Sequence, residues 1–248
     1  MEKKKGIKKI IIGIVIVILI FLGLIFFMAF KELQEEDILK QEIVNYSNKD
    51  FATDDFSIEV KTTGDRAYIE EAVKKYYKSL SDSIKAINNH LNDEELTNIL
   101  TLNSLRNDSP NYIKSHELIN NTKNKVTKEL ENISSLCEEE TIKNLIDKDK
   151  LSDSEYYYEF YLDLMYTKKD LELLNATKKE METLSTKFNE FLDKVDEILT
   201  FLETNANYIE YTDTNINFAN DSLLDEYNTL VNDLTILANN MTNKESDI

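Results

Sequence analysis

The first pattern along the chain is an uninterrupted apolar run. Residues 10–30 read IIIGIVIVILIFLGLIFFMAF and contain no charged residue. At about 1.5 Å per residue, a helix of this length spans roughly 30 Å, the thickness of a bilayer core. The run exceeds the roughly 7–15 apolar residues of a cleavable signal peptide, and no small-residue cleavage site follows it. It therefore predicts an uncleaved transmembrane signal anchor.

Charges flank this run asymmetrically. Five lysines precede it within 1–9, whereas one lysine and then four acidic residues follow it within 31–37. Because positive charge is retained on the cytoplasmic side, we expect a single-pass protein of the plasma membrane with its N-terminus inside and its C-terminal domain outside. The predicted parts are a basic cytoplasmic tail (1–9), a membrane anchor (10–30), a stalk (31–50), a helical-bundle ectodomain (51–243) and a disordered tail (244–248).

Four amphipathic stripes dominate the ectodomain. In each, the residues recur in steps of mostly three and four, which places them on one face of a helix. The stripes are Ile69, Val73, Tyr76, Leu80, Ile84, Ile87 and Leu91; Tyr112, His116, Ile119, Thr122, Val126, Leu130, Ile133 and Cys137; Tyr157, Phe160, Leu164, Thr167, Leu171, Leu174, Lys178, Met181, Ser185, Phe188, Leu192, Val195, Leu199 and Leu202; and Leu223, Leu224, Tyr227, Leu230, Val231, Leu234 and Leu237. They predict an antiparallel helical bundle with long helices in coiled-coil-like packing.

The third stripe allows two interpretations. Its spacing is kept over about six heptads, which favours one helix over 152–204. Lys178 and Ser185 interrupt the apolar series, and residues 175–177 are then the expected place for a kink or a break.

Two segments have the period of a strand instead. Phe56, Ile58 and Val60 alternate with polar residues, and so do two short runs, 209–211 and 216–218, on either side of a four-residue loop at 212–215. The second pattern predicts a small hairpin, and we expect 56–61 to add a third strand to it. The predicted fold class is therefore mainly all-α, with a small β-hairpin or mini-sheet.

Polar residues mark the expected helix starts. A side chain that accepts a hydrogen bond from the first turn is typical of an N-cap, and Glu three residues later completes a capping box. On this basis we expect caps at Asp65, Asn92, Ser109, Ser152 and Asp221.

The composition narrows the function classes. The chain has four Gly and one Pro in 248 residues, and 47 acidic against 29 basic residues give a formal net charge of −18. Glycine-poor chains cannot build the phosphate-binding loops of nucleotide folds, and an acidic surface excludes nucleic acid as a partner. A single cysteine permits no internal disulfide. The abundance of Asn, Lys and Ile is typical of AT-rich coding and favours a bacterial source.

The residues that could carry chemistry do not form a known pattern. Neither His90 nor His116 belongs to a Glu-x-x-His or His-Glu-x-x-His motif. Cys137 lies on an apolar stripe beside three glutamates, which favours a buried thiol over a nucleophile. The acidic loops beginning at Asp147 and Asp213 lack the glycine and the final glutamate of a calcium loop. We therefore expect no catalytic residue, no metal site and no cofactor, and hence no enzyme.

An aromatic cluster at 156–161 offers a different role. Tyr156 and Tyr158 cannot share the buried face with Tyr157, Phe160 and Tyr161, so they are candidate partner-binding anchors. We expect a protein-interaction or scaffolding module at the cell surface that contacts the lipid bilayer through 10–30 and a protein partner or a second copy through helical faces. The alternative is a ligand- or cation-sensing bundle that acts through a partner protein.

Overall fold

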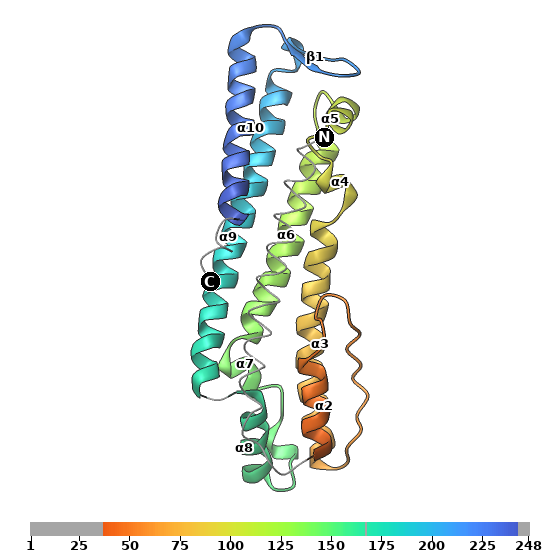
Figure 1. The fold of residues 1–248 in the computed structure, drawn as a ribbon, viewed down its shortest axis with the longest axis vertical. Helices are drawn as coiled ribbons and strands as arrows, with labels where there is room; N and C mark the ends of the chain where they lie inside the picture. Colours follow the sequence, from red (N-terminus) through yellow and green to blue (C-terminus); the bar gives the residue numbers. More distant parts are fainter. Residues whose placement is uncertain (1–36, 167, 243–248) are drawn as a thin grey trace. The chain divides into compact units, whose positions relative to one another are not determined.

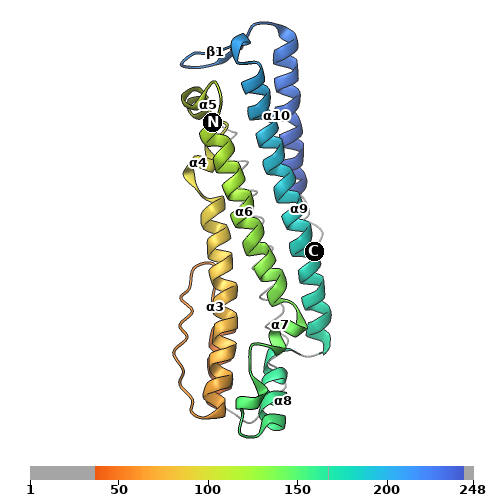
Figure 2. The ribbon, with the colours of Figure 1, turned by 180° about the vertical axis from the view of Figure 1, so that it is seen from behind.

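The computed structural model describes residues 37–166 and 168–242 (Figures 1 and 2). These residues are mainly helical and include one two-stranded antiparallel sheet, which confirms the predicted fold class at this level. The predicted cytoplasmic tail, membrane anchor and disordered tail lie outside the described residues. Among the residues that are described, no helix is both long and apolar enough to cross a membrane.

The chain divides into two compact units. The described part of the first, here called the strap unit, comprises residues 37–87, 128–166 and 168–183. The described part of the second, here called the hairpin unit, comprises 88–127 and 184–242. Three long helices contribute residues to both units: α3 (Asp65–Leu91), α6 (Ile113–Leu136) and α9 (Lys168–Thr204).

The strap unit begins with α2 (Asp37–Ser47) and a non-helical segment, residues 48–64, that we call the strap. The strap runs along the outer side of α3, as the orange trace in Figure 1 shows. Rings of Tyr46, Phe51, Phe56 and Tyr77 meet at centroid distances of 5.0–6.2 Å and attach it to α2 and α3. The remaining elements of this unit are α7 (Glu139–Lys143), η1 (Lys148–Lys150) and α8 (Ser154–Met165).

The prediction that 56–61 joins the hairpin was wrong. The sheet has two strands, and residues 56–61 belong to the strap unit, where no described strand pairs with them. Side chains of α2 and α3 bind the strap backbone in place of a neighbouring strand: the Tyr46 hydroxyl donates to the Ser57 oxygen, and Glu70 accepts from the Lys61 amide. The alternating pattern of 56–60 did not produce a paired strand. Of its apolar residues, Phe56 is buried and Ile58 is exposed.

The hairpin unit contains α4 (Glu94–Thr97), α5 (Leu102–Asp108), η2 (Ala206–Tyr208), β1 (Ile209–Tyr211), β2 (Ile216–Phe218) and α10 (Asp221–Thr242). The predicted hairpin is confirmed, with Ile209 opposite Phe218 and Tyr211 opposite Ile216. The ring of Phe218 lies 5.2 Å from that of Tyr227 and 6.4 Å from that of Phe201. These contacts join the hairpin to α9 and α10, which lie side by side in Figures 1 and 2.

Burial confirms most of the helical stripes. Every member of the α3 stripe is buried, and in the second stripe His116 is half-buried while the others are buried. In α9 the buried position falls on Thr177 instead of Lys178, because a lysine at the edge of the stripe can direct its ammonium outward. The Lys178 ammonium pairs with Glu138 at 2.6 Å.

The single-helix interpretation of 152–204 was wrong, and so was the expected place of the break. Helix α8 ends at Met165 and α9 begins at Lys168. Tyr166, between them, has an extended backbone with φ −166° and ψ 152°, which no helix accommodates. Residues 175–177 continue α9, where the Thr177 hydroxyl donates to the Leu173 oxygen.

Several predicted caps were displaced by one residue. Asp93, Asp153 and Asn220 accept from the first-turn amides of α4, α8 and α10, in place of Asn92, Ser152 and Asp221. The replaced residues have other partners, since Asn92 donates to Asn88 and Ser152 donates to Asp65. Two other starts also differ. The Gly64 oxygen accepts from the first turn of α3, and the Asp108 carboxylate accepts from Ser115 in α6, which begins three residues after Pro110.

Gly64 provides a test of the junction between the strap and α3. Its φ is +63°, and a Cβ there would meet no atom within 4 Å. Gly64→Ala should therefore lower the free energy of unfolding by about 1 kcal/mol through backbone strain rather than a clash. Gly64→Asn adds a larger side chain but tolerates positive φ better, so urea denaturation should show a smaller loss. A larger loss for Asn than for Ala would contradict this explanation.

Candidate functional site

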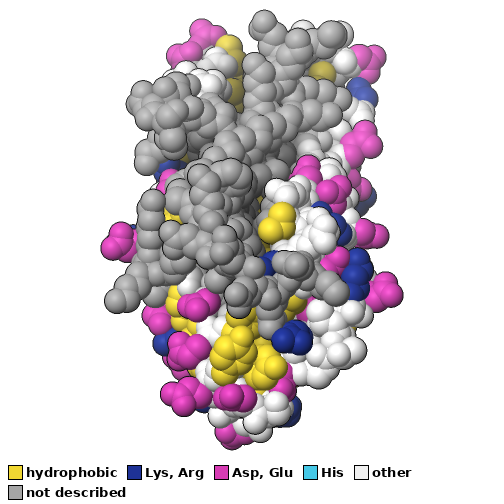
Figure 3. Space-filling view, turned by 60° about the horizontal axis from the view of Figure 1, so that its bottom comes forward, with side chains coloured by type: hydrophobic (Ala, Val, Ile, Leu, Met, Phe, Trp, Pro, Cys, Tyr) yellow, Lys and Arg dark blue, Asp and Glu magenta, His cyan; other side chains and the backbone are white. Residues whose placement is uncertain are grey.

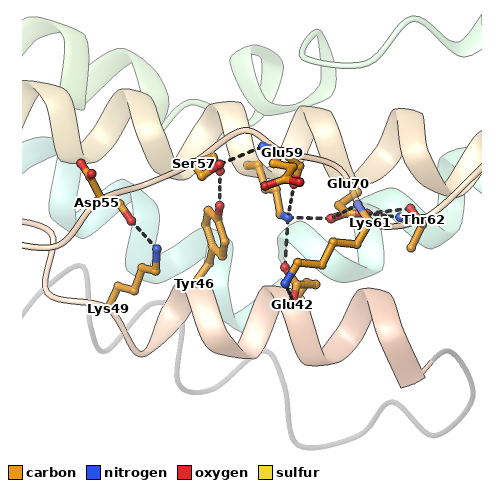
Figure 4. Close-up of polar contacts among 10 residues, drawn as sticks. Glu42, Tyr46, Lys49, Asp55, Ser57, Glu59, Lys61, Thr62 and Glu70 are labelled. Carbon is orange, nitrogen blue, oxygen red and sulfur yellow. Dashed lines mark hydrogen bonds and ion pairs between the residues drawn. The ribbon is translucent and has the colours of Figure 1, made fainter.

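A cluster of polar side chains in the strap unit surrounds one buried lysine. The Lys74 side chain, on α3, is 3% exposed. Its Nζ lies 2.6 Å from Glu70, 3.0 Å from Glu42 and 2.6 Å from the backbone oxygen of Glu59 (Figure 4). An ammonium has three donors, so each has an acceptor. We call Lys74, Glu70, Glu42 and the strap residues 59–62 the Lys74 latch.

Glu70 holds the last part of the strap. Its carboxylate is fully buried and accepts from the amides of Lys61 and Thr62 at 3.1 and 2.9 Å, and from the Thr62 hydroxyl at 2.7 Å. The Lys61 ammonium lies 2.7 Å from Glu42 on α2. The latch therefore joins three segments of the chain, namely α2, the strap and α3.

Electrostatics favour the charged forms of this cluster. Burial opposes ionisation of Glu70, but hydrogen bonds from Lys74, Thr62 and the Lys61 backbone outweigh it and hold the carboxyl pKa below its ordinary value. The pKa of Glu42 is likewise lowered, since bonds from Lys61 and Lys74 outweigh the effect of burial. For Lys74, burial is outweighed by the two carboxylates, which raise its pKa.

This arrangement is suited to holding structure together. Two carboxylates face two ammonium groups, so the cluster is electrically balanced, and the contacts of both carboxylates come from the chain itself. Removal of one member of such a buried pair is costly, because it leaves a charge without a partner. The latch thus fixes α2 and the strap on α3.

Sequence reasoning missed the latch, although a signal exists. Glu70, Lys74, Tyr77 and Ser81 follow one another in steps of four, three and four, next to the apolar stripe of α3. All four are buried. Charged residues normally face solvent, so the charges of Glu70 and Lys74 alone suggest an exposed face. Only their spacing relative to Tyr77, an aromatic residue, indicates that this face of α3 is buried as well.

The predicted partner-binding tyrosines differ in their surroundings. Tyr156, in the first turn of α8, is 56% exposed, and its ring stacks on Phe160 at 6.5 Å. Tyr158 is half-buried, with the Lys148 ammonium 5.3 Å from its ring centre. Figure 3 shows hydrophobic side chains among acidic and basic ones at the lower end of Figure 1, where α8 lies. A role of Tyr156 and Tyr158 in partner binding stays a prediction.

His116 forms one of the polar contacts between α6 and α9 in the hairpin unit, together with the pairs Lys123–Asp193 and Thr127–Asn189. Its Nδ1 lies 2.6 Å from Asp196, and its Nε2 lies 3.8 Å from Glu203, beyond hydrogen-bond distance. No group of three or more His, Cys, Asp or Glu within the described residues is arranged to hold a metal ion. His90 lies half-buried in the last turn of α3.

The other candidate residues have structural contacts. Asp147 caps η1, Asp153 caps α8, and Asp213 forms an ion pair with Arg106 at 2.8 Å. Cys137 is buried as predicted, and burial raises the pKa of its thiol to about 12. The thiol therefore stays protonated near neutral pH.

The chain resembles no protein of known family or structure at a significant level: no protein-family model, no curated protein and no solved structure matches it. Its function therefore has to be argued from its own residues.

The Lys74 latch predicts a large difference between two neighbouring glutamates. Glu70→Gln removes a buried charge that faces Lys74 and should lower the free energy of unfolding by about 3 kcal/mol. Glu71→Gln is the matched control, because Glu71 pairs with Lys75 at the surface and such pairs contribute about 0–1 kcal/mol. Urea denaturation at pH 7 measures both variants, and equal losses would show that the latch does not stabilise the fold.

Acid should reduce the difference in the free energy of unfolding between the wild type and Glu70→Gln. The folded-state pKa of Glu70 is lowered, so its contribution is complete above the ordinary value near 4.5 and is lost as the pH falls through the folded-state value. Below about pH 4.5 the wild type should therefore lose stability more steeply than Glu70→Gln.

The buried thiol gives a further test. Cys137 should react with iodoacetamide at pH 8 at least about 100-fold more slowly in the folded protein than in urea, because burial both blocks access and disfavours the thiolate. Mass spectrometry of the alkylated chain measures the two rates. Similar rates would show that the Cys137 thiol is accessible to the reagent in the folded protein.

Proposed function

We propose that this chain is a single-pass membrane protein whose extracytoplasmic helical part binds a protein partner and acts as an interaction or scaffolding module at the cell surface. In this proposal, residues 10–30 anchor the chain in the plasma membrane with the N-terminus in the cytoplasm. The apolar length of that segment and the five lysines before it support this orientation.

The main support for partner binding is the apolar stripe of α10. Among its residues whose side chains the structure describes, Leu234 is buried, Leu224 is 40% exposed, and the others are half-buried. The stripe of α3, in contrast, is buried throughout. An amphipathic helix whose apolar face is only partly covered is a typical docking surface for another helix.

The charges of α10 indicate the chemistry of the partner. The helix carries four carboxylates, Asp221, Asp225, Glu226 and Asp233, and neither Lys nor Arg. Asp233 lies 3.9 Å from Lys194 of α9. A partner with apolar side chains flanked by Lys or Arg fits this surface, whereas the net charge of −18 disfavours nucleic acid.

The proposal assigns no catalytic reaction to the chain. Its best-connected buried charges are those of the Lys74 latch, whose donors and acceptors bind one another. The candidate anchors Tyr156 and Tyr158 belong to the strap unit and form a separate candidate for partner binding.

A substitution at the edge of the α10 stripe tests this proposal. Leu224→Glu places a charge among apolar contacts and should reduce partner recovery more than tenfold when the tagged full-length chain is cross-linked in intact membranes. Ser222→Glu is the matched control, since it adds the same charge at an exposed position of the same turn and should leave recovery unchanged. A wild-type chain that remains monomeric and recovers no partner would contradict the proposal.

The alternative, a sensor of calcium or a small ligand, has a different signature. A ligand that binds the folded state raises the melting temperature, so melts of the full-length chain with calcium and with a panel of small molecules separate the two functions. A clear rise together with unchanged recovery in Leu224→Glu would favour the sensor.

A further inference from the structure

The strap binds the rest of its unit through alternate residues. The backbone oxygens of Ser57 and Glu59 accept from Tyr46 and Lys74, and the amide of Lys61 donates to Glu70. The partners of these three odd-numbered residues lie on α2 and α3. Figure 4 shows these side chains reaching the strap from the two helices.

The even-numbered residues between them are different. The backbone groups of Phe56, Ile58 and Val60 take part in none of the hydrogen bonds of the described residues. In an extended chain, the amide and carbonyl of one residue point to one edge, and those of the next residue point to the other. The bonds at 57, 59 and 61 therefore direct the backbone groups of 56, 58 and 60 away from α2 and α3. This alternation ends at Lys61, because the next amide, that of Thr62, also donates to Glu70.

The unpaired edge coincides with an exposed apolar side chain. Ile58 is 46% exposed, and it lies in a segment of high β-propensity. In Figures 1 and 2 the strap runs along the outer side of α3. An unpaired extended backbone with an apolar side chain is a template for another strand.

We propose that the strap of one chain pairs antiparallel with the strap of a second copy, centred on Ile58. In this register Ile58 lies opposite Ile58, and Phe56 opposite Val60, so all three residues with unpaired backbone groups find partners. Lys61 lies opposite Asp55 at both ends, which brings opposite charges together.

Two registers shifted toward the end of the strap are less favourable. Pairing centred on Glu59 places that carboxylate opposite its own copy, and like charges directly opposite one another are destabilising. Pairing centred on Val60 places Ile58 opposite Thr62, whose amide already donates to Glu70. Compared with these two registers, the available backbone groups and the charges favour the register centred on Ile58.

Attachment to a membrane strengthens this contact. Two short strands bury less than the roughly 1,000 Å² of a stable interface, so the pairing is weak in dilute solution. Confinement of both copies to one bilayer raises their effective concentration. In this respect the inference rests on the proposed function, whose membrane anchor supplies the confinement.

Cysteine cross-linking tests the register. In the full-length chain in membranes, with Cys137→Ser as background, Ile58→Cys should form a disulfide-linked dimer under mild oxidation. Opposed residues of an antiparallel pair lie about 5.5 Å apart at Cα, within disulfide range. Val60→Cys is the matched control, because in this register the two copies of position 60 lie four residues apart, about 13 Å.

We expect at least tenfold more dimer from Ile58→Cys than from Val60→Cys. Adding Val60→Pro to Ile58→Cys should reduce the dimer at least fivefold, because proline removes an outward amide and leaves the bonds at 57, 59 and 61 in place. Equal yields from the two cysteines, no dimer, or a cross-link to a different protein would each overturn the pairing. These outcomes leave partner recovery through α10 unaffected, so failure here is distinguishable from failure of the proposed function.

Discussion

A buried ammonium group is tolerated only where other acceptors replace the water that it loses. Lys74 meets this condition with one oxygen from each of three segments, since Glu42 belongs to α2, Glu59 to the strap and Glu70 to α3. The aromatic rings around Tyr77 supply apolar burial for the same segments, but rings can pack in several arrangements. The directional hydrogen bonds of Lys74 and Glu70 select one of these ring arrangements. They thereby determine the position of the strap.

The hairpin unit is organised differently. Polar contacts such as Arg106 with Asp213 and His116 with Asp196 involve partly exposed side chains, and the buried residues of this unit are mostly apolar. Rings of Phe201, Phe218 and Tyr227 close the end where α9 turns into the hairpin and α10. Along the rest of α10, the apolar stripe is only partly buried, and Leu224 at its edge is exposed. The strap unit thus has paired charges in its interior, whereas part of the α10 stripe of the hairpin unit is exposed.

The elements that could be predicted from sequence are those with a repeating pattern. The α3 stripe, most of the α6 stripe and the hairpin with its four-residue loop follow from spacing, because burial imposes the same period along the element. Cap positions depend on which of two neighbouring polar residues finds a competing partner, as Ser152 does in Asp65. The break at Tyr166 interrupts a regular series of apolar residues, so spacing could not reveal it.

The strap and the latch show a deeper limit. A period of two predicts extended backbone, but not what will bind its edges, and here helices supply the partners that a neighbouring strand would supply. A run of charged residues predicts a face in contact with solvent. The exception is a pair of opposite charges that the fold buries together. That depends on residues 42 and 74, which lie far apart in the sequence.

The pair between Glu42 and Lys74 also closes a loop of the chain, whose two ends are 32 positions apart in the sequence. A disulfide across such a loop would also constrain the unfolded chain, whereas an ion pair breaks on unfolding and holds the loop only in the folded state. A chain with a single cysteine has no such bond available within itself. Here an ion pair holds the loop, so this contact is insensitive to reductants and depends instead on the ionised state of its carboxylates.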